Sequence, residues 1–225
     1  MKARRTVNAV IDSIIKPSTC FANISENARY YFTSSVIIFA IAAVSSFLSS
    51  FLNVWYWNPN AENYLDFRLI PFLMSTSHTL LQNIVLVAAI FWIGKQWGGT
   101  TSFKKIFSVI SHCLVPATAG AVLIPVAMAL ISQSLSAGTG VGGSSMDLDL
   151  ELSPRYALDY ASSAIISFGL LIPFAAWIFT LFVKATRIVN NFDLKKSIIT
   201  VVFGIGVMYL SQMVFGISSH LLFNL

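Results

Sequence analysis

Five long stretches of the chain contain no aspartate, glutamate, lysine or arginine, and apolar residues dominate each of them. Each stretch is at least about 20 residues long, and a helix of that length crosses a hydrocarbon layer about 30 Å thick. The pattern therefore predicts an all-α, polytopic membrane protein with five transmembrane helices. The expected spans cover approximately residues 30–52, 69–94, 106–132, 160–183 and 197–223.

The basic residues between these stretches are unevenly distributed. Twelve of the 14 lysines and arginines lie in the first, third and fifth of the intervening segments, counted from the amino terminus. The second and fourth segments contain only Arg68 and Arg155. Because cytoplasmic loops retain Lys and Arg, we expect the amino terminus in the cytoplasm and the carboxyl terminus outside, with the plasma membrane as the location.

The composition supports a membrane protein with a single membrane domain. Hydrophobic residues make up 56% of the chain and charged residues 10%, with a mean hydropathy of +0.75, whereas a soluble domain carries about 25% charged residues. The net charge is +5, and the basic residues lie beside the span ends. Anionic headgroups of the cytoplasmic leaflet are therefore the expected partner, and nucleic acid is not. Residues 1–29 form a cytoplasmic segment, and residues 30–225 form the membrane domain.

The segment before the first span is amphipathic. Its apolar residues recur at helical spacing, at Val7, Val10, Ile11, Ile14 and Ile15. The other faces carry Arg4, Arg5, Asn8, Asp12 and Lys16, and Pro17 ends the helix. Two interpretations are open. The helix lies in the headgroup region of the inner leaflet, or it packs on the cytoplasmic ends of the spans.

His78 and Gln82 form the most suggestive polar pair within an expected span. They are four residues apart and share a helical face, and polar groups at such depth face protein or water. An interhelical hydrogen bond is the favoured interpretation. The alternative is a path for a neutral solute, in a small transporter or channel lined by the second to fourth spans. Pro116, Pro125 and Pro173 support it, because prolines inside spans predict kinked or broken helices.

The remaining candidates indicate no catalytic or metal chemistry. Cys20 and Cys113 fall on the cytoplasmic side, so free thiols are expected. The three histidines lie at different depths and no Cys-x-x-Cys spacing occurs, so we expect neither a metal nor a cofactor. The alternating Asp147, Asp149 and Glu151 are interpreted as a solvated outer loop, with a calcium site as the weaker alternative. Hydrolase, kinase and nucleotide-binding signatures are missing, which disfavours an enzyme.

Three short motifs follow one another in a recognisable order. Residues 16–24 carry Pro-x-x-x-Phe-x-x-Ile before the first span, and residues 98–103 read Gly-Gly-Thr-Thr-Ser-Phe, followed by Pro116. Trp177 then precedes the basic pair at 195–196. This order resembles the YIP family of Ypt/Rab-interacting multispan membrane proteins, in its prokaryotic form. The resemblance implies a compact five-helix membrane domain and a scaffolding role without catalytic residues.

The family's eukaryotic Asp-Leu-Tyr-Gly-Pro element is absent from the cytoplasmic segment. We therefore expect a non-enzymatic protein that organises membrane, or binds membrane-protein partners or a second copy of itself, through its cytoplasmic face. The residues expected to contact lipid or partners are Arg4, Arg5, Lys16, Pro17, Phe21, Gly98, Gly99, Phe103, Lys104, Lys105, Lys195 and Lys196.

Overall fold

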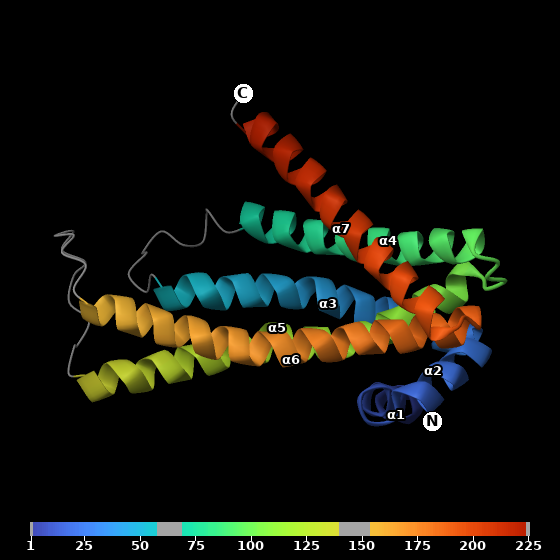
Figure 1. Ribbon diagram of the computed structural model, residues 1–225, viewed down its shortest axis with the longest axis horizontal. Coiled ribbons are helices and arrows are strands. Elements are labelled where there is room, and N and C mark those ends of the chain that lie inside the picture. The colour runs from blue at the N-terminus through green and yellow to red at the C-terminus, as the bar shows by residue number, and fades with distance from the viewer. Residues whose placement is uncertain (1, 58–68, 140–153, 224–225) are drawn as a thin grey trace.

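The computed structural model describes residues 2–57, 69–139 and 154–223 (Figure 1). These residues form the helices α1 (Lys2–Ile15), α2 (Pro17–Glu26), α3 (Ala28–Trp57), α4 (Leu69–Gln96), α5 (Phe103–Thr139), α6 (Pro154–Asn190) and α7 (Leu194–Phe223). No strand occurs within these ranges. The predicted all-α class is confirmed.

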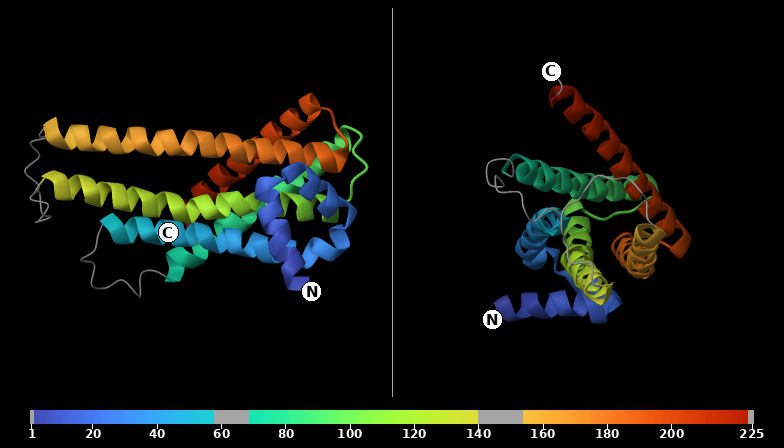
Figure 2. Two further views of the ribbon diagram at one scale, coloured as in Figure 1. Left: turned by 90° about the horizontal axis from the view of Figure 1, so that it is seen from below. Right: turned by 90° about the vertical axis from the view of Figure 1, so that its left-hand side faces the viewer.

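Three long helices, α3, α5 and α6, run side by side along the length of the molecule (Figures 1 and 2). The other two long helices, α4 and α7, pack against each other and cross this layer obliquely. The short helices α1 and α2 lie at the end where α4 turns into α5 and α6 turns into α7. The fold therefore gathers the amino-terminal segment and two turns at one end.

Among the residues that the structure describes, four helices are long and apolar enough to cross a membrane, judged by length and composition. The qualifying segments are Ala28–Ser45 in α3, Thr76–Gln96 in α4, Ile172–Asn190 in α6 and Leu194–Val214 in α7. They overlap four of the five expected spans over most of their length, as a multi-pass membrane protein requires. The remaining expected span, residues 106–132, lies in α5, which has 37 residues and is therefore about 55 Å long. That α5 crosses the membrane stays a prediction.

The prolines inside the long helices do not interrupt them. The helix α5 continues through Pro116 and Pro125, and α6 continues through Pro173. The broken helices that the sequence pattern allowed are therefore not observed. Membrane helices tolerate such prolines because neighbouring helices and Ser or Thr side chains satisfy the freed backbone groups.

Small residues allow the long helices to approach closely. Ser35 on α3 donates a hydrogen bond to the Ser108 carbonyl oxygen on α5 at 3.3 Å. At Gly120 an added Cβ would overlap the ring of Phe174, and at Gly204 it would lie 3.0 Å from the Ile90 side chain. Small residues at such crossings are typical of membrane helices. The α3–α5, α5–α6 and α4–α7 pairs thus pack through small side chains.

Candidate functional site

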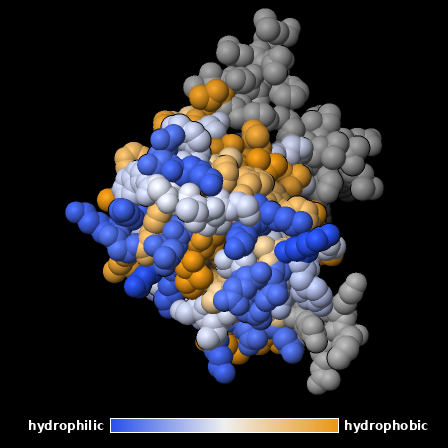
Figure 3. All heavy atoms as spheres, turned by 90° about the vertical axis from the view of Figure 1, so that its right-hand side faces the viewer, coloured by the Kyte–Doolittle hydropathy of each residue, from blue (hydrophilic) through white to orange (hydrophobic). Residues whose placement is uncertain are grey.

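One end of the bundle carries most of the exposed positive charge that the structure describes. Besides α2, it contains the α4–α5 turn (97–102) and the α6–α7 turn (191–193). Seven exposed basic side chains surround these turns, namely Lys95, Lys104, Lys105, Lys184, Arg187, Lys195 and Lys196. We call this region the basic end. Figure 3 looks at it, with hydrophilic side chains spread over the face and hydrophobic residues between them.

The α4–α5 turn closes the carboxyl end of α4 with a Schellman motif. Gly98 has φ of +85°, and the Gly99 N–H donates to the Gly94 carbonyl oxygen at 2.8 Å, which is the 6→1 bond of that motif. A Cβ on Gly99 would lie 2.7 Å from the Gly94 carbonyl oxygen and 2.9 Å from Oδ1 of Asn190. Gly98 is thus required by the backbone, and Gly99 by close packing against α6.

The α6–α7 turn is built in a similar way. Asn191 has φ of +55°, and the Phe192 N–H returns to the Arg187 carbonyl oxygen at 3.1 Å. Asp193 then caps α7, because its Oδ1 accepts the Lys196 N–H at 2.7 Å. Thr101 of the neighbouring turn donates to the Val189 carbonyl oxygen. The α4–α5 turn is therefore bonded to the carboxyl end of α6, directly before the α6–α7 turn.

The lysines of this end lie beside aromatic rings. Lys104 Nζ is 4.7 Å from the centroid of the Phe32 ring, and Lys196 Nζ is 6.0 Å from that of Phe192. Phe103 is partly exposed, and its ring contacts those of Phe91 and Phe107. Phe103, Lys104, Lys105, Lys195 and Lys196 are thus accessible, as a contact surface requires.

The helix α2 is anchored in the bundle. Pro17 is its first residue, where a proline costs no hydrogen bond, and Phe21 and Ile24 are both 0% exposed. These two side chains belong to the core formed with α5 and α6. The Pro-x-x-x-Phe-x-x-Ile motif therefore encodes a packing helix. Phe21, expected as a contact residue, is buried and is unavailable to a partner in this arrangement.

The helix α1 packs with its small residues and presents its isoleucines outward. Ala9 is 5% exposed and Ser13 is 0% exposed, whereas Ile11, Ile14 and Ile15 are 47%, 39% and 66% exposed. The helix lies crosswise to the long helices and extends beyond the side of the bundle (Figure 2). One side of this helix thus packs on the bundle, and its isoleucine side is exposed. Its position in the headgroup region stays a prediction. The side chains of Arg4 and Arg5 lie outside the described part.

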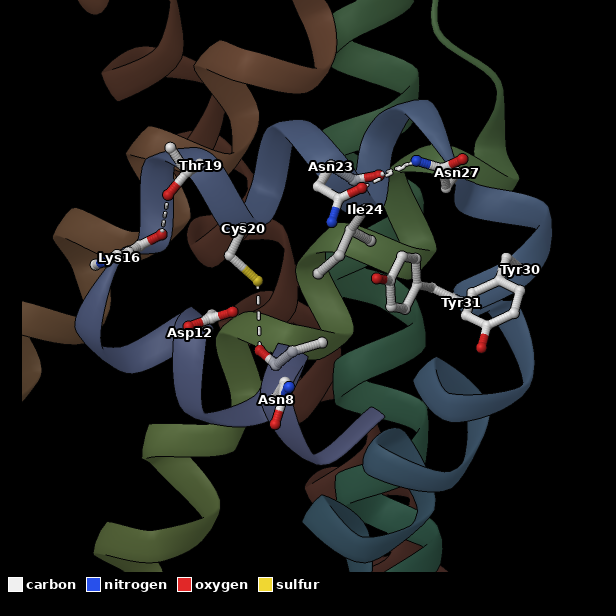
Figure 4. Close-up of a pocket in the computed structure, with 11 residues that line it drawn as sticks. Asn8, Asp12, Lys16, Thr19, Cys20, Asn23, Ile24, Asn27, Tyr30 and Tyr31 are labelled. Carbon is white, nitrogen blue, oxygen red and sulfur yellow. Dashed lines mark hydrogen bonds between the residues drawn. The ribbon is translucent and has the colours of Figure 1, made fainter. Parts of the chain in front are cut away.

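A groove of about 580 Å³ lies between α1, α2 and the start of α3. Figure 4 shows its residues: Asp12 and Asn8 come from α1, Asn23 from α2, and Tyr30 and Tyr31 from α3. Its lining also contains Ala9, Lys16, Thr19, Cys20, Ile24 and Asn27. Its polar side chains come mostly from the two amino-terminal helices.

A buried thiol lies at the base of this groove. The Cys20 S–H donates to the Ala9 carbonyl oxygen at 3.3 Å and so links α2 to α1. Burial raises the pKa of the Cys20 thiol to about 12, and the negative charge of Asp12 adds to the rise. A protonated thiol of this kind is a structural donor and a poor nucleophile. Cys20 and Cys113 are both free, as the sequence predicted.

The intramembrane pair predicted on α4 is close in space. His78 Nε2 and the amide nitrogen of Gln82 are 2.7 Å apart, and both side chains are half-buried. Since two nitrogens can share only one proton, the Gln82 amide donates to the histidine ring. This bond lies within α4. An interhelical hydrogen bond of this pair stays a prediction, as does the path for a neutral solute.

His112 is buried at the α3–α5 contact, where its Nδ1 donates to the Ser108 carbonyl oxygen at 2.8 Å and its ring meets that of Tyr31 edge-on. Within the described ranges no group of three His, Cys, Asp or Glu side chains is placed to hold a metal ion. The acidic run at Asp147, Asp149 and Glu151 falls outside those ranges.

The groove was not predicted from the sequence. Its polar side chains have a signal in the sequence, because Asn8 and Asp12 are four residues apart on α1, and Asn23 on α2 is four residues before Asn27, which caps that helix. Each pair therefore lies on one helical face. The spacing does not predict the angle between α1 and α2, and it is this angle that brings the two polar faces together.

A family model described as the Yip1 domain matches residues 11–215 of this chain. The match begins within α1 and ends within α7. It includes both turns of the basic end, every groove residue except Asn8 and Ala9, and four of the five expected spans in full. No curated protein and no solved structure matches the chain.

Proposed function

Because the chain belongs to the Yip1 domain family and is a multi-pass membrane protein, we propose that it organises membrane and partner proteins through its basic end. The role is non-enzymatic. The amino terminus lies in the cytoplasm and the carboxyl terminus outside the plasma membrane. The observation that carries this proposal is the outward isoleucine face of α1, on a helix whose other side is packed against the bundle.

An exposed isoleucine face on a packed helix needs an apolar environment. Each isoleucine that leaves water contributes about 1.5–3 kcal/mol, and Ile11, Ile14 and Ile15 all remain largely outside the protein core. A helix that lies crosswise to membrane-spanning helices is parallel to the membrane surface. In that orientation the isoleucines enter the boundary between headgroups and acyl chains. The helix then acts as a wedge in one leaflet.

The charge of the basic end favours the cytoplasmic leaflet. Seven exposed lysine and arginine side chains lie there, and each basic group near an anionic surface contributes about 1 kcal/mol. The rigid turns hold Lys104, Lys105, Lys195 and Lys196 in place, with the exposed ring of Phe103 beside them. An aromatic ring among fixed cations suits an acidic segment of a partner protein.

The position of α1 is tested by spin labelling in liposomes. Single cysteines are introduced as Ile15→Cys and, on the neighbouring side of the same helix that lines the groove, Asp12→Cys, in a chain with Cys20 and Cys113 replaced by alanine. We expect the label at residue 15 to be accessible to oxygen and protected from a water-soluble relaxation agent, and the label at residue 12 to show the reverse. Water-like accessibility at residue 15 would contradict the membrane position of α1.

The scaffolding role is tested by photo-cross-linking in native membranes, with a cross-linking amino acid in place of Phe103. We expect the same partner proteins in replicate experiments, and their loss in Lys104→Glu/Lys105→Glu. A matched control is Lys184→Glu, which changes an exposed lysine on α6 instead. If no partner recurs, or if the control loses the same partners, the contact surface is not at the α4–α5 turn.

A further inference from the structure

We propose that the groove between α1, α2 and the start of α3 binds a phosphoethanolamine group, which is a phosphate diester with a primary ammonium group two carbons away. The proposal deepens the proposed function and depends on it only for the position of α1 at the membrane surface. It names a specific ligand for this end, in addition to nonspecific attraction to anionic lipid. Four observations on the groove support it.

The size of the groove suits a small polar group. Its volume is about 580 Å³, within the range of about 300–1,000 Å³ that is typical of ligand sites. Its base is formed by the buried residues Cys20, Ile24 and Tyr31, so a ligand enters against a fixed surface. The groove opens between the helices, as Figure 4 shows.

The charges of the groove select a zwitterion. It contains one carboxylate, Asp12, and one ammonium group, Lys16, on consecutive turns of one helical face. Side chains four residues apart have neighbouring Cβ atoms, about 5–6 Å apart, so one small zwitterion in the groove can reach both charges. Asp12 and Lys16 are both described, and the structure records no ion pair between them, so each charge is left to a ligand. A ligand with only one kind of charge would pair with one of them and be repelled by the other.

The neutral side chains supply further donors and aromatic surface. Asn27 Nδ2 donates to Oδ1 of Asn23 at 2.9 Å, so the Asn23 oxygen is occupied and its amide nitrogen is oriented to donate. Figure 4 shows that nitrogen directed into the groove. Tyr30 and Tyr31 form the α3 wall. Amide N–H groups bind phosphate oxygens, and aromatic faces attract ammonium groups.

The surroundings of the groove connect it to the membrane. The largely exposed Ile11 and Ile15 lie on the same helix as Asp12, and Tyr30 stands at the start of the first membrane-spanning segment. A lipid whose headgroup occupies the groove can place its acyl chains along these apolar side chains. Phosphatidylethanolamine is therefore the expected source, and a soluble phosphoethanolamine ester has the same headgroup chemistry.

The experiment measures which lipid remains bound to the full chain. The protein is reconstituted with equal parts of phosphatidylethanolamine and phosphatidylcholine, extracted gently, and examined by native mass spectrometry. The two lipids differ only in the methyl groups on nitrogen, which prevent phosphatidylcholine from donating a hydrogen bond to Asp12. Since only phosphatidylethanolamine can donate this charge-assisted hydrogen bond, we expect at least roughly tenfold enrichment of it, which corresponds to about 1.4 kcal/mol.

Three variants locate the site. Asp12→Asn is expected to abolish the enrichment, and Lys16→Gln to lower the retention of both lipids. Asn23→Leu keeps the charges but removes the donor, and is expected to weaken retention if either charge variant fails to fold. Glu26→Gln is the matched control, because it changes an exposed charge outside the groove. It is expected to retain lipid like the unaltered chain.

Competition with glycerophosphoethanolamine, which has no acyl chains, distinguishes the two sources. Displacement of the lipid by this ester identifies a site that also accepts a soluble ligand, and retention of the lipid shows that the acyl chains contribute. The proposal is overturned if phosphatidylethanolamine is not enriched, if Asp12→Asn retains the enrichment, or if anionic phosphatidylglycerol, added in equal part to the same mixture, is preferred. None of these outcomes changes the accessibility measured at residue 15, so the position of α1 is judged separately.

Discussion

The two amino-terminal helices are both short and amphipathic, but they use their apolar residues in opposite ways. In α2 the large apolar side chains Phe21 and Ile24 are fully buried, and the polar residues face outward. In α1 the small residues Ala9 and Ser13 are buried, and Ile11 and Ile15 face outward. The same pattern of apolar spacing therefore serves as an anchor in one helix and as a free apolar surface in the other.

This difference shows that amphipathic spacing alone does not identify what a helix face contacts. Close packing of α1 depends on small side chains, which let its backbone approach α2 so that the Cys20 thiol reaches the Ala9 carbonyl oxygen. Larger side chains on that face would hold the helices apart. The isoleucines are consequently left for the membrane, where their burial is favourable.

The largest loss of stability is expected in α2, whose buried side chains anchor it in the bundle. Phe21→Ala removes a fully buried ring from the core shared by α2, α5 and α6, and such truncations cost about 3–5 kcal/mol. We expect a lower midpoint of thermal unfolding in detergent, with earlier release of α2. Ile15→Ala on α1 is the comparison. Equal losses in the two variants would remove the distinction between the helices.

The next largest loss of stability is expected at the α4–α5 turn, which is closely packed like α2. Gly99→Ala forces a methyl group toward the Gly94 carbonyl oxygen and the Asn190 side chain, and overpacking of this kind costs about 1–3 kcal/mol. Gly206→Ala is the matched control, because nothing lies within 4 Å of its added Cβ. A measured unfolding free energy unchanged in Gly99→Ala would contradict the observed packing.

Cys20 tests whether α1 covers α2. At pH 8 the thiol is protonated, because its pKa is raised to about 12, and maleimide labelling of the folded chain is expected to be slow. Deletion of residues 2–15 removes the covering helix and Asp12, and labelling is expected to accelerate about tenfold, which corresponds to about 1.4 kcal/mol. Cys113, buried between the long helices, is the internal control and stays protected.

The raised pKa of Cys20 also predicts how stability depends on pH. The thiol in the folded chain holds its proton to a higher pH than the thiol in the unfolded chain, whose ordinary value is 9.0. The contribution of the protonated Cys20 thiol to the free energy of unfolding is therefore complete below about pH 9. It is lost as the pH rises toward 12. Unfolding midpoints measured across this range should fall less steeply in Cys20→Ala than in the unaltered chain.

The smallest change in stability is expected on the exposed isoleucine side of α1. Ile15→Ala removes a side chain that is 66% exposed, and surface substitutions usually change stability by no more than about 0.5 kcal/mol. The same change is expected to lower the oxygen accessibility of a label placed at residue 11, because α1 enters the leaflet less deeply. A large loss of stability would show that this side chain packs inside the protein.

Several elements followed directly from the residues. Charge-free apolar stretches predicted the long helices, and four of them qualify as membrane spans. Pro17 predicted the boundary between α1 and α2, and the glycine pair predicted the turn that closes α4. These features depend on hydropathy and on backbone conformation, which are properties of individual residues and their near neighbours. The Yip1 domain match from 11 to 215 confirms the family that the motifs indicated.

The site depended on contacts between distant segments. Asn190 meets Gly94 and Gly99 although about 90 residues separate them, and Phe21, expected at the surface, is buried by α5 and α6. Prolines in α5 and α6 predicted kinks or breaks, but neither helix is broken. In each case the outcome depends on what another helix places nearby.

The sequence by itself determined that this chain is helical, that it belongs in a membrane and where its basic residues gather, because hydropathy, charge and turn chemistry act locally. Only the tertiary structure decided which face of α1 packs, since Ala9 and Ile15 are both acceptable on a buried face. It also decided that the polar faces of α1 and α2 meet in a groove with Asp12 and Lys16, because the angle between two helices is set by the bundle on which they pack.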